Sequence, residues 1–136
     1  MTDKKIFKKT INKILTEQYE FKKIANVWQR KVNDYWIQID LQKSNYSNIC
    51  FINTTIFVEK YEFDKKGRIE YLMGGLGHFT RLGERTEYVD LDNDFDEYQI
   101  FSGLTKIFEE HLKVIIQNIN HKLDWDKLIQ NRLLKF

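Results

Sequence analysis

The chain has 136 residues, of which 42% are hydrophobic and 15% aromatic, and its formal net charge is only +2. The length suits one domain with one core, and the apolar content offsets the chain entropy lost on folding, which excludes an intrinsically disordered chain. The small net charge argues against a dedicated duplex-DNA binder, whose affinity depends on many Lys and Arg contacts to phosphate. We therefore expect a single folded domain over residues 1–136.

The sequence shows neither a secretion signal nor a membrane span. Four lysines interrupt the first ten residues, and no later window approaches the roughly 20 apolar residues that cross a bilayer. Cys50 is the only cysteine, so an internal disulfide and a cysteine-based zinc site are both excluded. These features predict a protein of a reducing compartment, the cytoplasm, without membrane contact, and Cys50 is expected to be a buried, inert thiol.

Residues 3–18 predict an amphipathic helix. Its apolar residues recur at helical spacing with lysines between them, at Ile6, Phe7, Ile11, Ile14 and Leu15. Thr2 or Asp3 is a suitable N-cap, because a short oxygen-bearing side chain accepts a hydrogen bond from a free amide of the first turn.

The middle of the chain predicts strands. Residues 27–32 suit a strand, residues 35–42 alternate apolar and polar side chains as a strand with one wet face does, and residues 49–59 are rich in Phe, Ile, Thr and Val. Because the connections at 33–34 and 44–48 are too short for a parallel crossover, we expect an antiparallel meander. Two further strands are predicted at 68–73 and 78–87.

The last third predicts helices. Apolar residues recur at helical spacing as far as Ile119, which indicates one long helix from about Phe95 to Asn120, and Asp124 is a candidate N-cap for a short last helix. Helices at both ends of a run of strands favour an α+β fold. The expected architecture is a mostly antiparallel sheet of about five strands, packed against an N-terminal helix, a long C-terminal helix and a short last helix.

An acidic stretch precedes the long helix, with Asp90, Asp92, Asp94, Asp96 and Glu97. A calcium loop is excluded, because Phe95 and Phe101 occupy the positions where such a loop needs a glycine and a bidentate glutamate. Negative charge at a helix start interacts favourably with free amides, which explains part of the run. The remainder predicts a surface that binds a cationic partner. Residues 69–136 also carry a net charge of −4 against +6 for residues 1–68, although folding can interleave the two halves.

His78, Arg81 and Arg85 form a second candidate, a ligand-binding site beside the glycine-rich stretch 74–77. On a regular strand His78 and Arg81 point to opposite faces, so a shared site needs a bulge, and a charged strand end is the simpler interpretation. The glycines lack the Lys-Ser/Thr pair of a phosphate-binding loop, and no His-Glu-x-x-His pattern occurs. We therefore expect no metal and no cofactor.

A third candidate is single-stranded nucleic-acid binding by the basic N-terminal half. Its lysines and arginines are interleaved with two aromatic residues, Phe21 and Trp28, which offers phosphate contacts with base stacking. Packing of the two aromatics in the core is the simpler interpretation.

Several short motifs, in order, resemble a bacterial family known only as domain of unknown function 4304. They are Phe21-Lys22-Lys23, Trp28-x-Arg30, Leu41-Gln42-Lys43-Ser44, Phe51-Ile52-Asn53 and His78-x-x-Arg81-Leu82-Gly83. The tryptophan-bearing segment expected after the last motif is missing, and Tyr88 is the nearest substitute. The resemblance implies no established activity. Similar small domains occur beside bacterial polymorphic toxins, so it implies by analogy an immunity role against a cationic toxin domain.

No catalytic constellation stands out, so we expect a non-enzymatic binding protein whose partner contacts the acidic stretch. The alternatives are a small-ligand protein or enzyme that uses His78, Arg81 and Arg85, and a protein that binds single-stranded nucleic acid.

Overall fold

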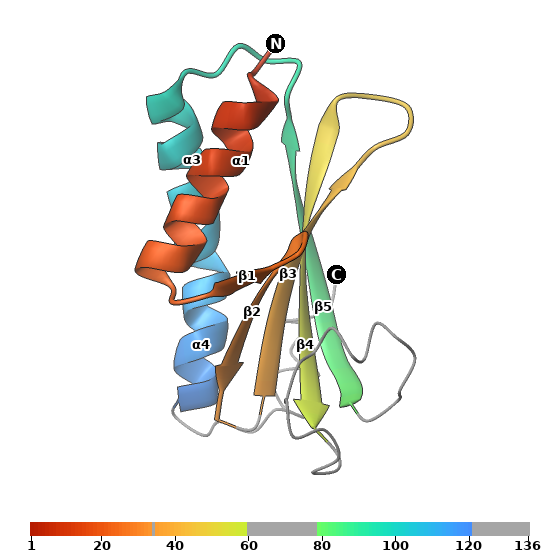
Figure 1. Ribbon diagram of the computed structural model, residues 1–136, viewed down its shortest axis with the longest axis vertical. Coiled ribbons are helices and arrows are strands. Elements are labelled where there is room, and N and C mark those ends of the chain that lie inside the picture. Colours follow the sequence, from red (N-terminus) through yellow and green to blue (C-terminus); the bar gives the residue numbers. More distant parts are fainter. Residues whose placement is uncertain (34, 60–78, 121–136) are drawn as a thin grey trace.

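Two helical segments cover one face of a five-stranded antiparallel sheet (Figure 1). This is a computed structural model, and it describes residues 1–33, 35–59 and 79–120. The helical elements are α1 (Lys4–Lys13), a π-helical turn η1 (Ile14–Gln18), α3 (Glu97–Glu110) and α4 (Leu112–Asn120). The strands are β1 (Lys22–Ile24), β2 (Val27–Val32), β3 (Tyr35–Lys43), β4 (Ile49–Glu59) and β5 (Phe79–Asp90). The α+β class is confirmed.

The sheet follows the chain, with spatial order β1-β2-β3-β4-β5 and every neighbouring pair antiparallel. The expected antiparallel meander is confirmed, but the strands that form it differ from the predicted ones. β1 lies in a mixed segment for which no separate strand is expected, and the strand predicted at 68–73 lies outside the described residues. The last strand runs to Asp90, three residues beyond the predicted end at 87.

Strand register divides the side chains between two faces. Trp28 of β2 pairs with Ile39 of β3, and Ile37 pairs with Ile56 of β4, so these buried apolar residues share the face under the helices. The opposite face is not uniformly wet as predicted, because Gln38 is only 4% exposed. Its partner Gln29 is buried as well, and the Gln29 amide nitrogen donates to the Gln38 amide oxygen over 3.1 Å. This hydrogen bond offsets part of the cost of burying two amides.

Helix α1 begins as predicted, with Asp3 as its N-cap. The Asp3 carboxylate accepts hydrogen bonds from the amides of Lys5 at 2.8 Å and Ile6 at 3.4 Å. Phe7 and Ile11 face the sheet one turn apart and are buried, whereas the lysines of α1 are exposed. Thr2, the alternative N-cap, instead donates its hydroxyl hydrogen bond to the Asn93 carbonyl oxygen, in the segment before α3.

The C-terminal helix is not continuous as predicted. Asp96 is still extended, α3 starts at Glu97, and the helix breaks at His111 before α4 resumes at Leu112. The break lets the two pieces follow the twisted sheet, since α3 packs against α1 while α4 contacts β2. The short last helix predicted after Asp124 lies outside the described residues.

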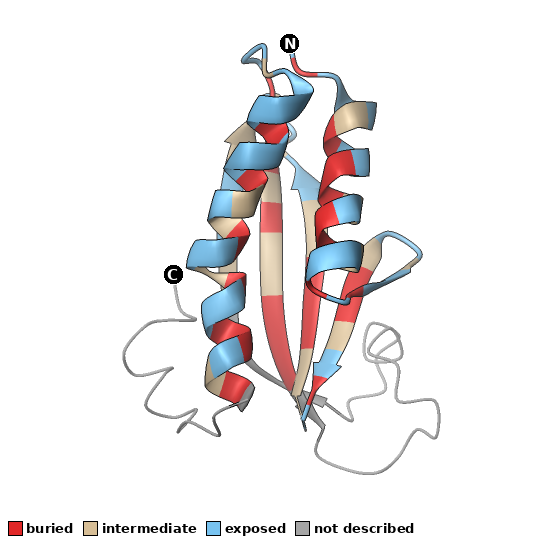
Figure 2. Cartoon of the chain, turned by 90° about the vertical axis from the view of Figure 1, so that its left-hand side faces the viewer, coloured by how far each residue is buried: buried red, intermediate tan, exposed pale blue. Residues whose placement is uncertain are grey.

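One hydrophobic cluster joins the helices to the sheet. In Figure 2 the buried parts of α1 and of α3 and α4 lie on the sides of the helices that face one another and the strands. Each fully buried side chain contributes roughly 1.5–3 kcal/mol to folding. None of the helices in the described part of the chain combines the length and the apolar character needed to cross a membrane.

Candidate functional site

Three parts of the chain meet at one end of the molecule: the N-terminus, the β3–β4 connection and the acidic segment after β5 (Figure 1). The amide of Thr2 donates to the Leu91 carbonyl oxygen over 2.8 Å, and the Leu91 amide donates to the Asn48 carbonyl oxygen over 3.0 Å. We call this end the acidic tip, and define it by Asp90, Asp92, Asp94, Asp96 and Glu97. The tip is therefore tied to two segments that are distant in the sequence.

Thr2 fixes the backbone of the acidic tip from inside. Its residue is only 2% exposed, and its hydroxyl donates to the Asn93 carbonyl oxygen over 2.5 Å. The same hydroxyl oxygen accepts a hydrogen bond from the Phe95 amide over 3.1 Å. A buried hydroxyl that both donates and accepts leaves this loop little conformational freedom.

Four carboxylates of the tip also hold local structure. Asp90 accepts from the Asp92 amide over 3.0 Å, and Asp92 accepts from the Asn48 side-chain nitrogen over 2.6 Å. Asp94 forms an ion pair with the N-terminal ammonium, whose hydrogen bond and charge hold the pKa of the Asp94 carboxyl below its usual value. Asp96 caps α3, where its carboxylate accepts from the Gln99 amide over 2.7 Å. The start of α3 therefore accounts for only one of these carboxylates, and the other three bind the neighbouring backbone, Asn48 and the N-terminus.

The N-terminal ammonium offsets the charge of Asp94, and the other structural tasks leave negative charge at the surface. Asp90 is half-buried, and the other four acidic residues are exposed. Two aromatic residues follow them on α3: Tyr98 is 77% exposed and Phe101 is 38% exposed. Glu97, Tyr98 and Phe101 line one hollow together with lysines of α1. The acidic tip is therefore a fixed, charged surface with an aromatic neighbour.

Sequence reasoning missed the aromatic part of this surface. Phe101 is apolar like the buried row Ile100, Leu104 and Phe108 of α3, but its exposure places it at the solvent edge of that row. Tyr98 precedes Ile100 by two residues, so it lies on the opposite side of α3 from the buried row. That off-row position is the signal from which an exposed tyrosine could have been recognised.

Arg85 lies on the helix-facing side of β5 and forms a cluster that the sequence did not predict. Its register partner is Thr54, and Glu87 follows two residues later on the same face. Both an Arg85 terminal nitrogen and Arg85 Nε lie 2.5 Å from Glu87 Oε1. A second partner is His111 at the break between α3 and α4, whose Nε2 is 2.6 Å from an Arg85 terminal nitrogen and 3.2 Å from Glu87 Oε1.

The cluster favours a neutral His111. Burial and the adjacent Arg85 charge lower the pKa of His111, and the opposing effects of Glu87 and Glu110 are smaller. A neutral ring with its proton on Nδ1 can accept the Arg85 hydrogen bond at Nε2. Because the Nε2 lone pair is then occupied, this imidazole holds the helix break against β5 rather than presenting a free base.

The predicted ligand cluster also includes His78 and Arg81. His78 lies outside the described residues. The backbone of Arg81 pairs with Phe57, whereas Arg85 pairs with Thr54, and the register shifts between Ile56 and Phe57. Phe57 and Thr54 belong to opposite faces of β4, so the positions of Arg81 and Arg85 do not share a face. A joint site of the three residues stays a prediction.

The aromatic residues of the nucleic-acid hypothesis are in the core. Phe21 is 4% exposed and Trp28 is 3% exposed. The Trp28 indole nitrogen donates to the Asn12 side-chain oxygen over 2.9 Å, and the Lys23 ammonium lies 5.5 Å from the Trp28 ring centroid. Base stacking on either ring would require the core to open, so this hypothesis retains only its phosphate contacts.

Cys50 is buried as expected, and burial raises the pKa of its thiol. Within residues 1–33, 35–59 and 79–120, no three His, Cys, Asp or Glu side chains gather as a metal site requires.

Two helices over one face of a five-stranded antiparallel meander, with a fixed acidic end, define a small α+β protein with an exposed charged surface. The chain belongs to the family described as Domain of unknown function (DUF4304), whose sequence profile matches residues 17–118. No curated protein and no solved structure matches the chain.

Proposed function

We propose that this chain is a non-enzymatic binding protein whose acidic tip captures a basic protein partner. The observation that carries the proposal is that the tip is exposed and fixed at the same time. Its backbone is held by Thr2 and Asn48, while four of its five acidic residues remain exposed. A preformed charged surface binds without the cost of ordering a loop, and it accelerates the encounter with a partner of opposite charge.

Tyr98 supplies the apolar part of the proposed interface. It is 77% exposed and directly follows Glu97 in the first turn of α3. Tyrosine side chains are enriched among the residues that dominate binding energy, because a rigid ring buries a large area and its hydroxyl keeps a polar contact. An immunity protein that neutralises a cationic toxin domain is the particular form of the proposal, and the single buried Cys50 suits action in the cytoplasm.

The test compares the proteins that the chain retains from an extract of its own cells. The variant combines Asp92→Asn, Asp94→Asn and Glu97→Gln, because an amide keeps an acceptor oxygen while it removes the charge. The control removes three exposed carboxylates elsewhere with Glu17→Gln, Glu109→Gln and Glu110→Gln. We expect the wild type and the control to retain a basic protein that the variant does not retain.

Growth of cells that express the retained protein, with and without the chain, then tests neutralisation. Rescue of growth by the wild type, but not by the tip variant, is expected for an immunity protein. Identical sets of retained proteins for the wild type and the tip variant would contradict the proposed role of the acidic tip.

A further inference from the structure

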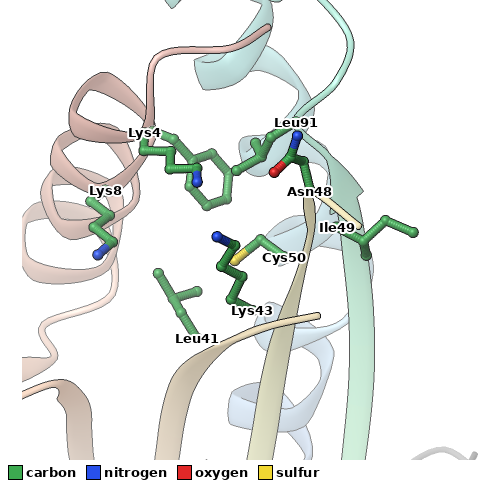
Figure 3. A pocket seen from close by; sticks show the side chains of 9 residues that line it. Lys4, Lys8, Leu41, Lys43, Asn48, Ile49, Cys50 and Leu91 are labelled. Atoms are coloured by element: carbon green, nitrogen blue, oxygen red, sulfur yellow. The ribbon is translucent and has the colours of Figure 1, made fainter. Parts of the chain in front are cut away.

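A small pocket with a basic mouth lies beneath the acidic tip, between α1 and the paired ends of β3 and β4 (Figure 3). Its volume is about 140 Å³. The walls are apolar and include Phe7 from α1, Leu41 from β3, Cys50 from β4 and Leu91 after β5. Binding sites for small molecules are concave and mostly apolar, with a few polar groups that fix the orientation of the ligand.

The charged groups of this pocket are lysines from two elements, and Asn48, whose side-chain nitrogen donates to Asp92, also lines it. Phe7 and Lys8 follow Lys4 by three and four residues on α1, so both are neighbours of Lys4 on the helix surface. Lys43 is the register partner of Cys50, which sets it on the same face of the sheet as the thiol. In Figure 3 the ammonium groups of Lys4 and Lys43 point toward one another across the mouth of the pocket.

Among the described residues, no ion pair neutralises the positive charges at this mouth. In the described part of the chain, Lys4, Lys8 and Lys43 each lack a carboxylate partner within 4.0 Å. The neighbouring Lys43 ammonium disfavours the charged form of Lys4 and lowers its pKa, and burial and Lys8 add smaller effects in the same direction. Two like charges that face each other without a counterion are the arrangement that a bound anion stabilises.

We propose that this pocket binds a small organic anion, whose charged head lies between Lys4 and Lys43 and whose short apolar body enters the space lined by Phe7, Leu41 and Cys50. The head group is a phosphate or a carboxylate, since both accept charge-assisted hydrogen bonds from two ammonium groups. The apolar walls require a ligand with a hydrocarbon part rather than an inorganic ion. This site takes a ligand of the opposite charge to the partner of the acidic tip, and it adjoins the tip through Asn48 and Leu91.

Cys50 provides a readout for the occupied pocket, because it is the only cysteine and it lines the cavity. The rate at which iodoacetamide alkylates Cys50 is measured at constant ionic strength with increasing concentrations of four probes. Butyl phosphate and butanoate carry both the anion and the hydrocarbon, butanol lacks the charge, and inorganic phosphate lacks the hydrocarbon. We expect the first two probes to slow alkylation at concentrations at which the last two have little effect.

Variants then assign the charge requirement to particular lysines. The double substitution Lys4→Gln and Lys43→Gln is expected to raise the concentration of butyl phosphate needed for half-protection by about tenfold. The matched control, Lys5→Gln with Lys113→Gln, removes two exposed lysines outside the pocket and should leave this concentration unchanged. Absence of protection by both anionic probes, equal protection by butanol, or an equal loss in the control would overturn the proposal. The relative protection by butyl phosphate and butanoate distinguishes a phosphate head from a carboxylate head.

Discussion

At the residue scale, long-range hydrogen bonds decide the role of individual polar side chains. Thr2 is linked to Asn93 and Phe95, and Arg85 is linked to His111, in each case across a large separation in the sequence. Local pattern can identify the N-cap role of Asp3, because the partners of a cap are two and three residues away. It cannot identify the roles of Thr2 or Arg85, because their partners become neighbours only once the sheet and helices have packed.

The Arg85 and His111 contact predicts the titration of His111. Replacing Arg85 with Gln removes a positive charge next to the ring, so we expect the pKa of His111 to rise toward its ordinary value while the contribution of burial remains. Ring-proton chemical shifts followed by NMR over pH measure this change. Lys113→Gln, which removes an exposed charge from α4, is the control and should leave the titration in place. An unchanged pKa in the Arg85 variant would contradict the assigned contact.

The lowered pKa of His111 also makes the free energy of unfolding depend on pH. The unfolded chain binds a proton at His111 near the ordinary pKa of 6.5, whereas the folded chain binds it only at lower pH. The free energy of unfolding therefore keeps the full contribution of neutral His111 above pH 6.5, and loses it as the pH falls through the lower folded value. In the Arg85→Gln variant this loss should be smaller.

At the element scale, turn residues determine which strand and helix boundaries can be predicted from the sequence. Strand β1 was missed because the turn that joins it to β2 is Ala25-Asn26, in which Ala25 adopts a φ of 53°. Alanine rarely occupies this left-handed region, so the residue gives no turn signal. By contrast, Asn33 has a φ of 54° in the predicted turn after β2, and asparagine tolerates that conformation. The apolar spacing of residues 100–119 passes through His111 without interruption, so the helix break was not visible in the pattern.

The capping box at the start of α3 predicts a difference between two substitutions. Asp96→Ala should lower the free energy of unfolding by about 1 kcal/mol, because the Gln99 amide loses its acceptor. Asp96→Asn should leave it almost unchanged, since asparagine caps helices about as well as aspartate. Urea unfolding followed by circular dichroism measures both, with Glu97→Gln as a control for loss of charge alone. Equal destabilisation by Ala and Asn would show that charge, not the hydrogen bond, stabilises this helix start.

At the scale of the whole molecule, the sequence was most informative about the order of layers. Short connections between strands required an antiparallel meander, and helical periodicity at both ends required helices on its surface. The charge asymmetry between the halves is partly cancelled in space, because the N-terminus pairs with Asp94 and the lysines of α1 lie beside Leu91. The basic pocket could not be predicted, since its lysines belong to a helix and a strand that are about 40 residues apart.

The central claim is that the fixed charge of the acidic tip steers a basic partner into the complex. Its most direct test is the association rate constant with the retained basic protein, measured by stopped-flow fluorescence at increasing NaCl concentration. Steering predicts that the rate constant of the wild type falls steeply with salt. For the variant with Asp92→Asn, Asp94→Asn and Glu97→Gln, it predicts a rate constant that is about tenfold lower in dilute salt and depends less on salt. The same rate constant and the same salt dependence in both proteins would contradict it.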